Sequence, residues 1–138
     1  MLQPLVLVVD DSEELRLLFS SVLTQSGYAV LQAHDGREAI VQATDHRPDL
    51  ILMDLDMPGV SGWEAVRHLK SDAHTAHIPV VAVTANPGSG LSARLRAARF
   101  SAYVAKPVRL PHLVEAVRTI YEASRAGASW VNLSVPAA

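Results

Sequence analysis

Short apolar runs alternate with amphipathic stretches along most of this 138-residue chain. Five runs rich in Val, Leu and Ala have the length of strands, and they cover residues 5–9, 29–33, 50–55, 79–84 and 102–106. The first, third and fourth runs are almost entirely apolar, which is typical of strands covered on both faces of a parallel sheet. The alternation therefore predicts an α/β protein.

Helical periodicity fills the intervals between these strands. The first helix follows "DDSEE", where Asp11 or Ser12 can cap it, and Gly27 suits its end. Its apolar positions are Leu15, Leu18, Phe19, Val22 and Leu23. Further helices are predicted over residues 36–46, 62–71 and 92–100, and a fifth starts near Pro111. Because βαβ crossovers are right-handed, this (βα)5 pattern predicts a doubly wound parallel sheet with helices on both faces.

Composition narrows the class of protein. Hydrophobic residues make up 49% of the chain and charged residues 19%, which favours a folded soluble domain over disorder. A formal net charge of −2 gives no reason to expect nucleic acid or an anionic membrane as the main partner. The absence of cysteine excludes disulfides, thiol catalysis and cysteine-ligated zinc. No apolar run is long enough for a membrane span and the N-terminus lacks a signal peptide's basic segment, so we expect a cytoplasmic protein.

Four of the five predicted strands end on a polar residue or directly before one. Asp10 and Asp11 follow the first strand, Asp54 the third, Thr84 the fourth and Lys106 the fifth. Ligands of open α/β sheets bind outside the carboxyl ends of the strands, so we expect these side chains to meet at one mouth. The six histidines, in contrast, form no ligand pattern and are expected at the surface.

The expected mouth suits one kind of chemistry. Three neighbouring carboxylates repel one another, and a hard divalent cation such as Mg²⁺ relieves that repulsion. A lysine can pair with a phosphoryl oxygen, and a threonine hydroxyl can donate to the same anion. Positioning and charge neutralisation are most of what phosphoryl transfer requires, so the set favours transfer of a phosphoryl group to an aspartate. Singly, Asp11 could be a helix cap and Thr84 an ordinary strand residue. The joint occurrence favours function.

Four motifs at these positions match a known family. They are "VVDD" at 8–11, "PDLILMDLDMPGVSGWE" at 48–64, "IPVVAVTA" at 78–85 and "AYVAKP" at 102–107. With them the chain resembles the receiver domain of two-component response regulators. The resemblance spans about residues 4–125 and implies a flavodoxin-like strand order, 2-1-3-4-5. We expect a stand-alone receiver over residues 1–126, followed by a tail over 127–138.

The resemblance assigns the central roles. It implies that Asp54 accepts the phosphoryl group, and that Asp10, Asp11, Asp54 and the backbone carbonyl of Asp56 hold Mg²⁺, with Mn²⁺ as an alternative metal. Lys106 would pair with the phosphoryl group, and Thr84 would move its hydroxyl towards it.

The resemblance also implies how a signal passes on. Tyr103 matches the family's aromatic switch, and Asp56 and Asn86 would tune how long the phosphoryl group lasts. The donor would be a phosphohistidine on a sensor kinase or a phosphotransfer protein. The face made by the fourth helix, fifth strand and fifth helix would change for an unknown downstream protein target, and a homodimer through this face or the tail is a further option. The protein would be no conventional enzyme, catalysing only its own phosphorylation and dephosphorylation.

Two regions depart from the family pattern. Arg99 and Phe100 stand where small residues are common, and the preceding loop "ANPGSGLS" is rich in Gly, Pro and Ser. The fourth helix is therefore expected to be short, shifted or mobile. The tail carries Trp130 and is expected to be a frayed terminus, with docking on another subunit or partner as the alternative.

Two other functions fit some of these residues. A haloacid-dehalogenase-type phosphatase would use Asp54 and Asp56 as a D-x-D pair, with Thr84 and Lys106 as its further polar residues. Against it, the pair follows the third strand rather than the first, the other acidic pair lies upstream, and the chain is short and leaves no room for a cap. A receiver-like scaffold that is never phosphorylated is the other alternative, and the intact polar set argues against it.

Overall fold

A computed structural model describes residues 3–133 and contains five parallel strands, each followed by a helix. The strands are β1 (Leu5–Val9), β2 (Ala29–Ala33), β3 (Leu50–Asp54), β4 (Val80–Thr84) and β5 (Ala102–Ala105). The helices are α1 (Glu13–Gln25), α2 (Gly36–His46), α3 (Gly62–Ser71), α4 (Leu91–Ala97) and α5 (Leu110–Arg125). The strand order is β2-β1-β3-β4-β5, which confirms the predicted doubly wound sheet. Within residues 3–133, no helix has the length and apolar character that crossing a membrane requires.

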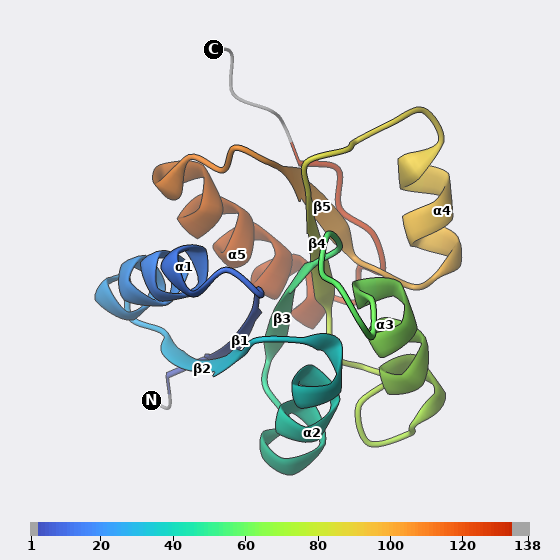
Figure 1. Ribbon diagram of the computed structural model, residues 1–138, viewed down its shortest axis with the longest axis horizontal. Coiled ribbons are helices and arrows are strands. Elements are labelled where there is room, and N and C mark those ends of the chain that lie inside the picture. Colours follow the sequence, from blue (N-terminus) through green and yellow to red (C-terminus); the bar gives the residue numbers. More distant parts are fainter. Residues whose placement is uncertain (1–2, 134–138) are drawn as a thin grey trace.

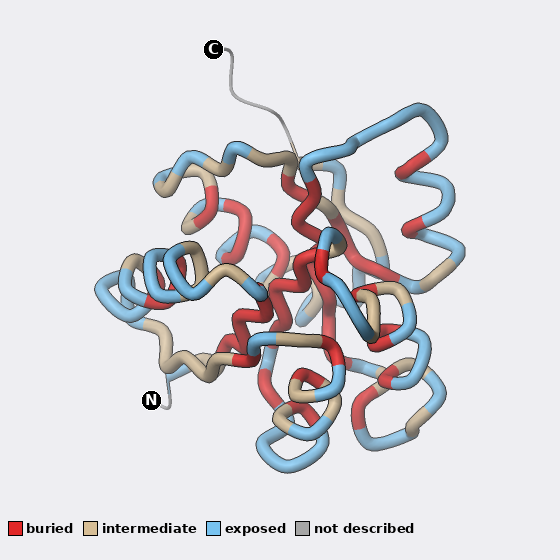
Figure 2. The backbone as a smooth tube through the Cα atoms, in the orientation of Figure 1, coloured by how far each residue is buried: buried red, intermediate tan, exposed pale blue. Residues whose placement is uncertain are grey.

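The sheet lies between two layers of helices (Figure 1). Helices α1 and α5 pack on one face, and α2, α3 and α4 pack on the other. Every residue of β3 and β4 is buried, and Figure 2 shows these strands as the buried centre of the molecule. Their nearly continuous apolar sequences follow from this double covering. The strand order reverses between β1 and β3, so their carboxyl ends open a crevice between the two layers.

The start of α1 separates the roles of two adjacent polar residues. The Ser12 hydroxyl accepts a hydrogen bond from the Leu15 N–H at 3.3 Å, so Ser12 is the N-cap. Asp11 is exposed and not needed for capping, which leaves its carboxylate available to the mouth. On the apolar side of α1, Phe19 is buried whereas Leu18 is 44% exposed.

Helix α4 is shorter than its predicted span of residues 92–100. It ends at Ala97, and Arg99 adopts a left-handed backbone conformation with φ of 68°. The Phe100 N–H then donates to the Leu95 carbonyl at 2.9 Å, which turns the chain and buries the Phe100 side chain in the core. The expectation of a short fourth helix is confirmed, and the predicted end at Phe100 is wrong because that residue belongs to the turn.

The segment after α5 packs against the domain. The Val131 N–H donates to the Ser101 carbonyl at 2.8 Å, at the start of β5. Trp130 packs against the core layer that holds α4, and Val131 and Leu133 pack against the other layer. The expected frayed terminus is therefore wrong for residues 130–133, while residues 134–138 of the predicted tail lie outside the described residues.

Candidate phosphoacceptor site

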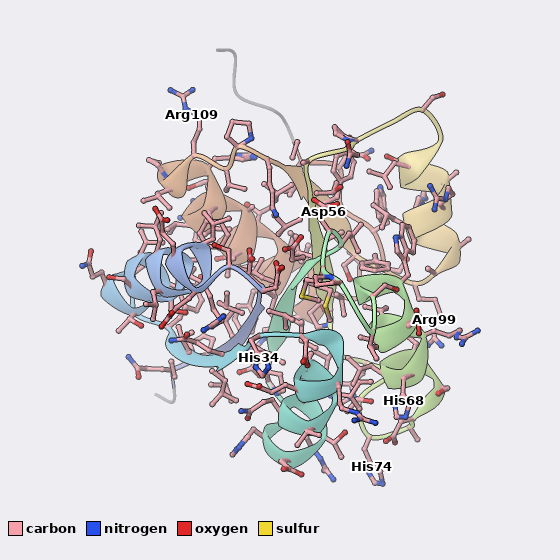
Figure 3. The ribbon with its side chains drawn as sticks, in the orientation of Figure 1. His34, Asp56, His68, His74, Arg99 and Arg109 are labelled. Atoms are coloured by element: carbon pink, nitrogen blue, oxygen red, sulfur yellow. The ribbon has the colours of Figure 1, made fainter. Side chains whose placement is uncertain are left out.

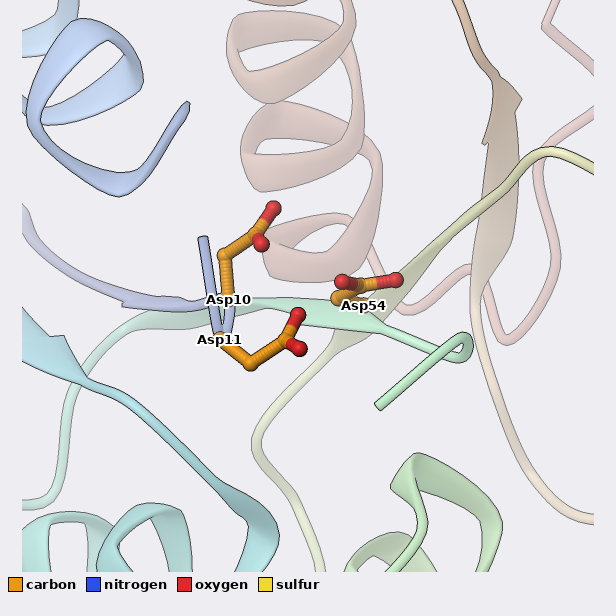
Figure 4. A group of neighbouring side chains, drawn as sticks. All are labelled: Asp10, Asp11 and Asp54. Carbon is orange, nitrogen blue, oxygen red and sulfur yellow. The ribbon is translucent and has the colours of Figure 1, made fainter. Parts of the chain in front are cut away.

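Three carboxylates from two neighbouring strands meet at the carboxyl edge of the sheet. Oxygen atoms of Asp10, Asp11 and Asp54 all lie within 4.8 Å of one another, and Figure 4 shows the three side chains together at the ends of β1 and β3. In the part of the chain that the structure describes, no other group of three or more acidic or histidine side chains converges in this way. His34 and His74, as Figure 3 shows, lie apart on the outer surface.

Asp54 is fixed at the end of β3. Its side chain is 2% exposed. Its Oδ1 atom accepts a hydrogen bond from the Asp56 N–H at 2.9 Å, and the Lys106 ammonium lies 3.2 Å from the same oxygen. The second carboxylate oxygen has no hydrogen bond among the described residues, so it is the one available to a metal ion or an incoming phosphorus atom.

Asp10 is held just as firmly at the end of β1. It is 2% exposed, and its Oδ1 atom accepts from the Ser12 N–H at 2.9 Å. Burial is the main cause that raises the pKa of Asp10 to about 6. The negative charge of Asp54 acts in the same direction, whereas the Ser12 N–H and the charge of Lys106 act against it. The buried charge is therefore costly. A bound cation would relieve the repulsion between these carboxylates. Because carboxylate oxygens are the ligands that hard divalent cations prefer, the residues present fit Mg²⁺.

Lys106 supplies the positive charge of the site. Its backbone N–H donates to the Thr84 carbonyl at 2.8 Å, which fixes the start of the loop after β5 to the end of β4. Its ammonium lies 3.2 Å from Asp54 Oδ1 and 3.8 Å from Asp56 Oδ2. A lysine held between two carboxylates is positioned to contact a group attached to either.

Asp56 and Thr84 are linked across β3 and β4. The Thr84 hydroxyl donates to Asp56 Oδ1 at 3.4 Å, and the Ala85 N–H donates to Asp56 Oδ2 at 2.9 Å. The Asn86 N–H in turn donates to the Thr84 hydroxyl oxygen at 3.1 Å. The Asp56 side chain thus contacts the end of β4, a position that the D-x-D spacing alone does not predict.

Tyr103 lies outside this cluster. It is half-buried on β5, opposite Ala82 of β4, and it lines a small cavity with Ser92 of α4 and His112 of α5. The structure therefore brings together six of the predicted site residues, which are Asp10, Asp11, Asp54, Asp56, Thr84 and Lys106. Asn86 is joined to this group only by its backbone N–H, which donates to Thr84. Tyr103 lies apart from the group, on β5, the strand that leads into Lys106.

Two further residues shape the site and were not predicted. Arg16 of α1 donates from Nη1 to the Asp10 carbonyl at 3.0 Å and from Nε to the Gln32 side chain at 3.1 Å, which ties β1, α1 and β2 together. Gly62 at the start of α3 passes so close to β3 that a Cβ there would lie 2.8 Å from the Asp54 carbonyl oxygen. Nothing in the spacing of the sequence indicates the role of Arg16. The glycine after "MPGVS" does indicate a place where two backbone segments come close together.

Comparison with known proteins agrees with this geometry. Residues 6–118 match the family model described as the response regulator receiver domain. The chain is 41% identical over 114 residues to the polar-differentiation response regulator DivK of Brucella anthropi, a match that covers 83% of this chain and 93% of the relative. Among solved structures, the chemotaxis protein CheY4 of Vibrio cholerae superposes with a TM-score of 0.82 at 28% identity, covering 86% of this chain and 99% of that one.

The fold and the mouth define a class, a doubly wound α/β protein with acidic residues, threonine and lysine at its strand ends. Within that class, the chain belongs to the response regulator receiver domain family of two-component signalling. The resemblance stated from the motifs is confirmed, and the phosphatase alternative is not favoured.

Proposed function

We propose that this protein receives a phosphoryl group on Asp54 and changes its binding surface in response. The observation that carries the proposal is the surroundings of Asp54, a buried carboxylate with two acidic neighbours within 4.8 Å and a lysine ammonium at 3.2 Å. The donor is a phosphohistidine of a sensor kinase or of a histidine phosphotransfer protein, and the protein acts in the cytoplasm.

The transfer itself needs little covalent chemistry from the protein. An Asp54 carboxylate oxygen attacks the phosphorus atom, the phosphorus–nitrogen bond of the phosphohistidine breaks, and the imidazole keeps the electron pair. Asp10, Asp11, Asp54 and the Asp56 carbonyl would hold Mg²⁺, or Mn²⁺, which neutralises charge on the transferred group when it is bound. Lys106 stabilises the product because its ammonium already lies beside the accepting carboxylate.

The switch starts at Thr84. In the unmodified protein its hydroxyl donates to Asp56 at the long distance of 3.4 Å. A phosphoryl group on Asp54 offers a more strongly charged acceptor nearby, so the hydroxyl moves to it. Tyr103 turns inward as Thr84 moves, and the surface formed by α4, β5 and α5, here called the α4–β5–α5 face, changes for a downstream protein target or a second copy.

The lifetime of the phosphorylated state depends on the groups around the mouth. Asp56 and Asn86 lie on the two loops that follow β3 and β4, and both are joined to Thr84 by hydrogen bonds. Attack of water on the phosphorus atom must pass these loops. Their side chains therefore set how easily water reaches the group.

An apolar surface beside the mouth suits a protein donor. A cavity of about 430 Å³ borders Lys106 and is lined by Leu15, Leu18, Phe19, Ala85, Pro107 and Val108. Leu17 and Leu18 of α1 are 50% and 44% exposed, so apolar side chains of this helix are open to contact with a partner. A helical donor protein docked here would bring its histidine to the carboxylate cluster. No feature of this surface favours nucleic acid or a membrane.

The proposal is tested with a small phosphodonor. The full chain is incubated with acetyl phosphate, with Mg²⁺ or with a chelator, and its intact mass is followed. One phosphoryl group should appear only with the metal. Sustained turnover of a chromogenic phosphate ester that depends on Asp56 would instead identify a phosphatase.

A further inference from the structure

The chain's own C-terminal segment lies on the α4–β5–α5 face. Residues 130–133 run along the outer edge of β5, and Figure 1 shows this segment between β5 and α4. β5 is the last strand of the sheet, so its outer backbone groups have no strand partner. The Val131 N–H fills part of that gap by donating to the Ser101 carbonyl at 2.8 Å.

Side chains of the segment add an apolar contact. The Trp130 ring packs against the core layer of α4, and the Arg96 guanidinium of α4 lies 5.5 Å from the ring centroid. The indole N–H donates to the Asn132 side chain at 2.9 Å, so the half-buried ring keeps a polar partner. Val131 and Leu133 pack against the layer of α5. One short segment therefore bridges both helices that flank β5.

The same segment contacts the surroundings of the switch tyrosine. Tyr103 lines a cavity of about 90 Å³ whose other walls are Ser92, Val104, Ala105, His112 and residues 130–133. Rotation of the Tyr103 ring or a shift of α4 would alter the walls against which the segment packs. Conversely, the docked segment favours the arrangement of Tyr103 and α4 seen here.

We propose that residues 130–133 are an intramolecular ligand of the α4–β5–α5 face, docked in the unphosphorylated protein and released when Asp54 is phosphorylated. The release step rests on the function proposed above. A tethered segment acts at a high effective concentration, so a partner binds weakly until the segment leaves. The partner that fits is a protein offering an extended apolar segment with an aromatic residue, which replaces Trp130 beside β5.

Docking is tested by amide hydrogen exchange on the full-length chain. The Val131 N–H should be protected in the wild type and in the control Ser129→Ala, whose side chain is exposed. In Trp130→Ala it should exchange at least about tenfold faster, while β3 amides remain unchanged and show that the fold is intact. Equal, unprotected exchange in the wild type and Trp130→Ala would overturn the proposal. So would light scattering that shows a dimer dissociated by Trp130→Ala, since the segment would then dock on a second copy.

Release is tested in the same samples after acetyl phosphate and Mg²⁺ are added. Intact mass reports whether a phosphoryl group is present, and Asp54→Asn is the control. Val131 exchange should accelerate in the phosphorylated wild type and stay unchanged in Asp54→Asn. A phosphorylated protein with unaltered Val131 exchange would overturn the release. Absence of the phosphoryl group would contradict the proposed function and the release, and the comparison with Trp130→Ala would still decide whether the segment docks.

Discussion

The Lys106 ammonium lies 3.2 Å from Asp54 Oδ1, although 52 residues separate the two in sequence and β4 lies between their strands. The lysine also lies 3.8 Å from Asp56. The carboxylate cluster thus carries a fixed positive charge at its edge. That charge supports an incoming phosphoryl group and opposes an incoming metal cation.

This opposition makes a prediction for Lys106→Met. Because like charges repel across the few ångströms of the site, removal of the ammonium should tighten Mg²⁺ binding several-fold. Phosphorylation by acetyl phosphate should slow, since the product loses its cation. Calorimetric titration with Mg²⁺ measures the first effect and intact mass the second. Arg109→Met is the matched control, because Arg109 is exposed and points away from the site (Figure 3). Weaker Mg²⁺ binding by Lys106→Met would contradict this reading of the charges.

The raised pKa of Asp10 predicts that the metal-free protein loses stability as pH rises. Its pKa is raised by burial from 3.8 to about 6, so the folded state binds more protons than the unfolded state between these values. The free energy of unfolding should therefore fall as pH rises from about 4 to 6. At pH 7 with a chelator, Asp10→Asn should be more stable than the wild type by roughly 1–3 kcal/mol. Urea unfolding at pH 4 and pH 7 measures this difference, and a larger gain at pH 4 would contradict it.

The lowered pKa of Lys70 predicts the opposite change, a gain in stability as pH rises in the alkaline range. Burial, with a smaller contribution from the charge of Arg99, lowers the pKa of Lys70 from 10.5 to about 8. The unfolded state binds more protons between these values, so unfolding free energy should rise with pH from about 8 to 10. Lys70→Met should lack this rise. Arg67→Met, on the exposed side of α3, should keep it. Denaturant unfolding of the three proteins at several pH values measures how the free energy of unfolding changes with pH. The same rise in all three proteins would contradict the prediction.

Gly62 predicts a steric constraint on the phosphoacceptor. In Gly62→Ala the new Cβ would lie 2.8 Å from the Asp54 carbonyl, so α3 or the end of β3 must shift. Such overpacking should cost about 1–3 kcal/mol of stability and slow phosphorylation through displacement of Asp54. Gly88→Ala is the control because no atom lies near its Cβ position. Thermal unfolding compares the two, and an unaffected Gly62→Ala would show that the approach is looser than described.

The sequence predicts the sheet and its mouth well because both follow from periodicity. Four strand ends carry polar residues, and a parallel sheet must bring them to one edge. The end of α4 is predicted less well, because Phe100 fits a helical pattern while Arg99 adopts a left-handed conformation that the pattern does not reveal. The contact of Val131 with Ser101 depends on packing over a gap of 30 residues. Local propensity contains no such information.

Asp56 illustrates the same limit inside the site. The D-x-D spacing makes Asp54 and Asp56 look equivalent. In the folded chain Asp54 faces the acidic pair, whereas Asp56 accepts hydrogen bonds from Thr84 and Ala85. The different roles of Asp54 and Asp56 therefore follow from the tertiary structure and not from their spacing.

The central claim is that Asp54, and not Asp56, accepts the phosphoryl group. The most direct measurement is the intact mass of the wild type, Asp54→Asn and Asp56→Asn after incubation with acetyl phosphate and Mg²⁺. We predict one added phosphoryl group on the wild type and on Asp56→Asn, and none on Asp54→Asn. An unmodified wild type, or equal labelling of the wild type and Asp54→Asn, would contradict the account.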